Sequence, residues 1–139
     1  MQGWVLPHLI AWVESRGADS VSIRRLLGTA DLTDPDLRVP EPSVETARRV
    51  AATLIHDDAI GVHVAEFMPR GALDLVEYAV RASASPAAGF ERLARYSHVL
   101  SDRVAARSEM NGQGLLFLIR DTGARRSMLA ALILHWRQH

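Results

Sequence analysis

The sequence contains no cysteine, no lysine and no long apolar segment. The absence of cysteine excludes disulfides, thiolate metal sites and a cysteine nucleophile. No apolar run approaches the roughly 20 residues that a helix needs to cross a membrane, and the N-terminus lacks the basic segment and cleavage site of a signal peptide. We therefore expect a soluble, cytoplasmic domain that is held together by its apolar core alone, with no membrane partner.

The charged residues of the chain balance one another. The 16 basic residues, all arginine, and the 16 acidic residues give a formal net charge of zero. Nucleic-acid-binding domains usually show a basic excess or stripe, because lysine and arginine neutralise phosphates. The pairs Arg24-Arg25, Arg48-Arg49 and Arg125-Arg126 are far apart in sequence, and we expect each to lie on a solvated helix face. This chain by itself is therefore not expected to bind DNA.

The length and composition fit a single domain. The chain has 139 residues, of which 48% are hydrophobic and 23% are charged, close to globular averages and enough to bury a core. It ends at His139 in an apolar segment with no helix-capping residue and no polar tail. We therefore expect residues 1–139 to form one domain that has been cut from a longer protein.

Apolar residues recur with the helical period over the first hundred residues. This spacing predicts six helices, with apolar faces over residues 6–13, 21–27, 44–55, 60–67, 73–80 and 90–99. Leu54 belongs to the predicted buried stripe of the third helix, for which Ser43 is the expected N-cap. Asp57-Asp58 is expected to begin the fourth helix, and Ser85-Pro86 predicts the start of the sixth. Asp121 or Thr122 is expected to cap a last helix that continues to Trp136.

The period changes from 3.6 to 2 near residue 104, which predicts a half-buried strand. Asn111-Gly112 predicts a type I′ hairpin turn, in which both central residues have positive φ, and Gly114 indicates a longer or bulged connection. The apolar residues 115–119 predict a second strand that is covered on both faces, or nearly so. The sequence thus predicts an α+β fold that is mainly helical, with a small antiparallel hairpin or sheet near the C-terminal third.

No catalytic or metal-binding motif is evident. The sequence has no nucleophile elbow, Walker loop or dinucleotide-binding glycine motif. Ser101, His98 and Asp102 are sequence neighbours at a helix end, where capping is a better explanation than a triad. The histidine pairs His56/His63 and His135/His139 lack a third ligand. We therefore expect no catalytic residue, no metal, no cofactor and no enzyme activity.

Several segments match one known pattern together. Residues 26–40 read LLGTADLTDPDLRVP, and residues 55–102 carry Asp58-Ala59-Ile60-Gly61, Gly71, Tyr78, Ser85-Pro86, Leu93, Arg95-Tyr96 and Leu100-Ser101-Asp102. With the following strand, turn, strand and helix, these features resemble the N-terminal, arabinose-binding-like domain of AraC/XylS transcription regulators. The resemblance spans roughly residues 5–137 and depends on the spacing of many parts rather than on one motif.

This resemblance implies a regulatory domain that senses a small-molecule effector of unknown identity and forms a homodimer. It also implies that a C-terminal helix-turn-helix domain, absent here, makes the contacts with DNA. Two alternatives stay open: a dimerisation module without a ligand, and a haem or gas sensor that uses His98. The second rests on a fainter likeness to the haem nitric-oxide-binding fold, which is weak evidence for function.

Four residues are the candidate ligand contacts: Tyr78, Arg95, Tyr96 and Arg103. A tyrosine offers an apolar ring with one hydrogen-bonding group, and an arginine offers a planar fork for carboxylates, both of which suit a mostly apolar pocket. The alternative is that Arg95 and Tyr96 only lock the sixth helix to the hairpin, with the tyrosine hydroxyl bonded to the backbone.

Overall fold

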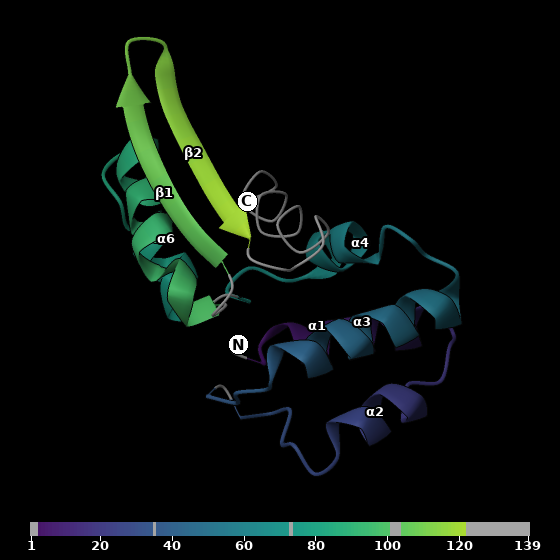
Figure 1. Ribbon diagram of the computed structural model, residues 1–139. Helices are drawn as coiled ribbons and strands as arrows, with labels where there is room; N and C mark the ends of the chain where they lie inside the picture. The colour runs from purple at the N-terminus through teal and green to yellow at the C-terminus, as the bar shows by residue number, and fades with distance from the viewer. Residues whose placement is uncertain (1–2, 35, 73, 101–103, 122–139) are drawn as a thin grey trace. The chain divides into compact units, whose positions relative to one another are not determined.

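The computed structural model describes residues 3–34, 36–72, 74–100 and 104–121 (Figure 1). The described chain contains six helices and a two-stranded antiparallel sheet near its C-terminal end, which confirms the predicted fold class. It divides into two compact units. We call the described residues up to Pro69 the helical unit and those from Arg70 to residue 121 the hairpin unit. The expectation that residues 1–139 form one domain stays a prediction, and the predicted last helix lies outside the described residues.

The helical unit is built around α3 (Glu41–Ile55), which packs against α1 (Val5–Ser15), α2 (Val21–Leu27) and α4 (Ile60–Phe67). The predicted apolar faces supply all of its core except Val39 and Met68. The apolar core side chains are less than a tenth exposed: Leu6, Leu9, Ile10, Val13, Ile23, Val39, Val44, Ala47, Ala51, Ile60, Val64, Ala65 and Met68. The prediction for Leu54 is wrong, because this side chain lies in the last turn of α3 and is 39% exposed. Helical periodicity therefore identified most of the core.

The predicted helix starts were right in one case and wrong in another. Ser85 precedes α6 (Pro86–Leu100), and its Oγ accepts a hydrogen bond from the Ala88 N–H at 3.2 Å, as expected of an N-cap. By contrast, α3 begins at Glu41, and its N-cap residue is Pro40 rather than Ser43. Pro42 fits inside the first turn because the N–H groups there have no partner within the helix.

One arginine pair departs from the predicted solvated faces. Arg48 is only 9% exposed, and its Nε and Nη2 donate hydrogen bonds to the Glu45 carboxylate at 3.1 and 2.7 Å. These bonds raise the pKa of the Arg48 guanidinium and satisfy the charge that burial would otherwise leave unpaired. Arg24, which bonds Glu14 at 2.9 Å, stays about half exposed.

In the hairpin unit, α5 (Asp74–Arg81) packs against α6, and α6 packs along β1 (Val104–Asn111), which pairs with β2 (Gly114–Asp121). Figure 1 shows α6 lying along one face of the hairpin. The Phe90 ring on α6 contacts the Phe117 ring on β2, with 5.1 Å between their centroids. Because side chains alternate along a strand, the residues on either side of Phe117 in sequence point away from α6.

The hairpin is confirmed, but the predicted type I′ turn is wrong. Asn111 remains in β1, and the turn is formed by Gly112 and Gln113. The Asn111 Oδ1 accepts a hydrogen bond from the Gln113 N–H at 2.9 Å, a local bond typical of asparagine in turns. Positive φ occurs at Gly114, at 139°, and at neither Asn111 nor Gly112. The glycine that the turn requires is therefore the one that begins β2.

The expectation that both faces of β2 are covered is also wrong. Leu116 is 44% exposed and Leu118 is partly buried. Both side chains alternate with Phe117 and therefore lie on the sheet face opposite α6. The apolar run predicted the strand correctly, but the described part of the hairpin unit leaves this second face open.

Candidate functional site

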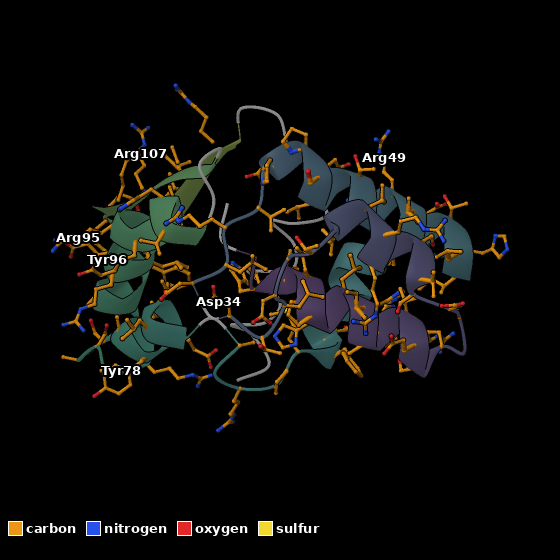
Figure 2. The ribbon with its side chains drawn as sticks, turned by 90° about the horizontal axis from the view of Figure 1, so that it is seen from below. Asp34, Arg49, Tyr78, Arg95, Tyr96 and Arg107 are labelled. Atoms are coloured by element: carbon orange, nitrogen blue, oxygen red, sulfur yellow. The ribbon has the colours of Figure 1, made fainter. Side chains whose placement is uncertain are left out.

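The candidate ligand contacts that the structure describes lie at the surface of the hairpin unit (Figure 2). Tyr78 on α5 is 72% exposed, and Tyr96 on α6 is 38% exposed. Arg95 donates from Nη2 to the Glu91 carboxylate of its own helix at 3.4 Å, with both side chains 66% exposed, so this ion pair does not connect α6 to the hairpin. Arg103 lies outside the described residues. A ligand-binding role for these four residues stays a prediction.

The histidines considered as metal ligands have other roles where they are described. His56 ends α3 in the left-handed conformation, with φ of 52°. His63 Nδ1 is 2.7 Å from Asp57 Oδ2, while Asp57 Oδ1 accepts a hydrogen bond from the Ala59 N–H. Within the described ranges, no three histidine or acidic side chains are placed to hold a metal ion.

The remaining histidine and triad candidates are mostly beyond the described chain. His98 is exposed in the last turn of α6, whereas Ser101 and Asp102 lie outside the described residues, as do His135 and His139. The structure therefore describes only His98 of these three residues, and its ring has no hydrogen bond or ion pair within the described ranges.

A hollow of about 450 Å³ lies on the hairpin sheet, lined by Ala105, Ala106, Arg107, Leu118 and Arg120. The sheet register places Arg107 opposite Leu118 and Arg120 opposite Ala105. Directly opposed residues of an antiparallel pair share a face, and residues two apart on one strand share it as well. The side chains of Arg107, Arg120 and Leu118 therefore lie on the face opposite α6.

The two arginines of the hollow differ in their surroundings. Arg107 donates from Nε to the Glu109 carboxylate at 3.1 Å, and both side chains are well exposed. Arg120 has no ion pair or hydrogen-bond partner for its side chain within the described part of the chain. The hollow thus combines two cations with the apolar side chain of Leu118, an arrangement that suits an anion with an apolar part.

Sequence reasoning selected Arg103, which lies outside the described residues, and missed Arg107 on β1 and Arg120 on β2. The alternation along residues 104–110 placed Arg107 on a definite face, but the partner residues on β2 follow only from the register. That register depends on the turn, and the predicted turn was centred one residue too early. With the turn at Gly112-Gln113, Arg120 lies opposite Ala105 and becomes a diagonal neighbour of Arg107, whereas the predicted turn would place these two arginines two residues further apart on the same face.

Comparison with known families identifies the chain. Residues 18–138 match the family described as the N-terminal arabinose-binding domain of AraC transcription regulators. The chain belongs to this family. The resemblance found in the sequence is therefore confirmed, and membership in the AraC family supports a ligand-sensing regulatory role. None of the curated proteins compared with the chain matches it.

In the ranges that the structure describes, no helix is both long and apolar enough to cross a bilayer.

Proposed function

We propose that this chain is the effector-sensing domain of an AraC-type regulator and that it controls DNA binding by a helix-turn-helix domain. The observation that carries the proposal is the family match over residues 18–138. The hollow on the hairpin sheet, with Arg107 and Arg120 beside Leu118, supports it as a place where a small molecule would bind. The chain would act in the cytoplasm by binding and not by catalysis.

The charge of the chain supports a division of labour between two domains. Its 16 basic and 16 acidic residues cancel, whereas affinity for DNA rises with the number of phosphates that a protein neutralises. DNA contacts therefore belong to the helix-turn-helix domain. We expect the isolated chain to give no specific shift of promoter DNA in an electrophoretic assay; specific retention would contradict this part of the proposal.

The mechanism is a shift between two arrangements of a homodimer. An effector that binds one arrangement more tightly increases the population of that arrangement. The size of the shift is set by the difference between the effector's affinities for the two arrangements. The arrangement then determines how two helix-turn-helix domains meet their half-sites, whose spacing on DNA is fixed. Coupling of this kind is reciprocal, so operator DNA bound to the whole regulator also changes the affinity for the effector.

A thermal-shift screen of the chain against sugars, amino acids, fatty acids and aromatic acids tests the sensing role. A compound at a hundred times its Kd adds about 2.7 kcal/mol to the free energy of unfolding, which raises Tm by roughly 5–15 °C for a domain of this size. We expect one of these classes of compound to raise Tm in a saturable way. A flat screen from a sample that melts cooperatively would favour a ligand-free dimerisation module instead.

A further inference from the structure

The face of the hairpin sheet opposite α6 places two arginines within reach of one anion. We call the residues of this face the arginine face: Ala105, Arg107, Glu109, Leu116, Leu118 and Arg120. The register makes Arg107 and Arg120 diagonal neighbours, since each lies opposite the residue two positions from the other. Diagonal positions across antiparallel strands are about 7–8 Å apart. Two arginine side chains are long enough to reach across this distance and contact the same anion. Figure 2 shows Arg107 extending outward from the hairpin.

Among the residues that the structure describes, the positive charge on the arginine face is only partly compensated. The described residues that line the hollow include no carboxylate, and Arg120 has no ion pair among the described residues. Glu109 contacts Arg107 through Nε at 3.1 Å, with side chains 71% and 49% exposed. An exposed pair of this kind is weak, and it leaves the terminal nitrogens of Arg107 available. A bound anion would therefore interact favourably with both guanidinium groups.

The apolar members of the face narrow the class of anion. Leu118 lines the hollow, and Leu116, the next residue on the same face of β2, is 44% exposed. An inorganic anion leaves these side chains in water, whereas an alkyl or aryl group removes them from it. The planar fork of a guanidinium also matches the two oxygens of a carboxylate.

We propose that the arginine face binds a small monocarboxylate with an apolar body, the carboxylate between Arg107 and Arg120 and the body over Leu116 and Leu118. This inference rests on the proposed function, because it names the chemical class of the effector. It assigns recognition to residues of the two strands and not to Tyr78, Arg95 or Tyr96.

Calorimetric titration of the whole 139-residue chain tests the assignment. The probes are sodium octanoate and sodium benzoate, with octanamide and benzamide as uncharged counterparts and sodium phosphate as an inorganic anion. We expect saturable binding of at least one carboxylate, with its amide and phosphate each at least tenfold weaker. Amide or phosphate binding as tight as the carboxylate would overturn the assignment, as would a titration in which neither carboxylate binds the folded chain.

Three variants locate the site. Arg120→Gln is expected to weaken carboxylate binding about tenfold to a hundredfold, the usual range for a charged hydrogen-bond donor. Arg49→Gln, at an exposed arginine of α3, is the matched control and is expected to change nothing. Glu109→Gln frees Arg107 from its competing carboxylate, so binding becomes tighter, an effect that general loss of structure does not produce. Equal affinities for Arg120→Gln and the unmodified chain would overturn the proposed site.

The thermal-shift screen separates failure of this inference from failure of the proposed function. If a neutral sugar raises Tm and neither carboxylate binds, the sensing role stands and the assignment of the effector as a carboxylate is refuted. A carboxylate whose binding survives Arg120→Gln but is lost in Tyr96→Phe or Arg95→Gln would move the site to α6 and refute the arginine face.

Discussion

The helical unit contains more buried apolar side chains than the hairpin unit, although its Val21, Leu26, Leu54 and Phe67 are each more than a third exposed. In the helical unit thirteen apolar residues are less than a tenth exposed; the described hairpin unit has two, Val76 and Leu93. Its exposed apolar residues include Leu75, Tyr78 and Met110, which are 68–74% exposed. Apolar burial is the main favourable term in folding. Most of the buried apolar core of the described chain therefore lies in the helical unit.

Truncation of a core residue gives the largest expected effect and tests this contrast directly. Ile60→Ala, at a fully buried position of α4, is expected to lower the free energy of unfolding by about 2–5 kcal/mol, because it removes buried methyl groups and leaves a cavity. Leu116→Ala, on the open face of β2, is expected to cost less than about 1 kcal/mol. Urea denaturation followed by circular dichroism measures both. Equal losses would mean that the second sheet face is as well covered as the core.

A second comparison lies within the hairpin unit, between two Glu–Arg pairs of the same i,i+4 spacing. Arg81 contacts Glu77 at 2.8 Å, and the Glu77 side chain is only 3% exposed; Arg95 and Glu91 are both 66% exposed. Arg81→Met is expected to cost about 1–3 kcal/mol, because it removes a bond to a buried carboxylate. Arg95→Met is expected to cost less than about 0.5 kcal/mol. The same denaturation experiment measures the loss of unfolding free energy in each variant. Similar losses for Arg81→Met and Arg95→Met would contradict burial of Glu77.

The two glycines of the hairpin give the next largest expected difference. Gly114→Ala places a side chain where φ is 139°, and we expect a loss of about 1 kcal/mol or more, since L-residues are strained there. Gly112→Ala has open space around its Cβ and no positive φ, so it is expected to be nearly neutral. Thermal melts compare the two variants. A larger loss for Gly112→Ala would restore the type I′ turn predicted from the sequence.

The smallest expected effect concerns a carboxylate in the helical unit. The Ser20 hydroxyl and then the Arg24 guanidinium donate hydrogen bonds to Glu14 and lower its pKa. A pKa lowered by folding contributes stability above the unfolded value, and this contribution is lost as the pH falls through the folded value. Ser20→Ala is therefore expected to raise the pKa of Glu14, as followed by NMR titration. Asp31, whose pKa is lowered by Thr33, serves as the internal control and should not move; an unchanged Glu14 would contradict the role of Ser20.

The helical unit was largely predictable because each helix carries its own period. The spacing of Leu6, Leu9 and Val13, for example, gave both the helix and its buried face. Helix ends were harder to predict than helix faces. Pro42 is compatible with a helix start on either side of it, and serine is a preferred N-cap residue, which favoured Ser43. Arg48 was misplaced because its burial depends on tertiary packing around α3, which the sequence period does not describe.

The candidate site was harder to predict than the fold, because its residues come from two strands. Arg107 and Arg120 are thirteen positions apart in sequence, and only the register makes them diagonal neighbours on their face. That register was set by the turn, where the Asn111 side chain bonds the backbone and moves the turn one residue along the chain. A one-residue error at the turn changes which residues face one another throughout the sheet.

The alternation of the two strands also limits how this domain changes in evolution. Phe117, which contacts α6, is followed directly by Leu118, which lines the hollow. Deletion or insertion of one residue within either strand would exchange the faces beyond it, turning a charged side chain toward the helix and an aromatic ring toward water. Only changes of two residues preserve both faces. In natural variants we therefore expect length changes within these strands to occur in pairs, while single-residue changes gather at the Gly112-Gln113 turn.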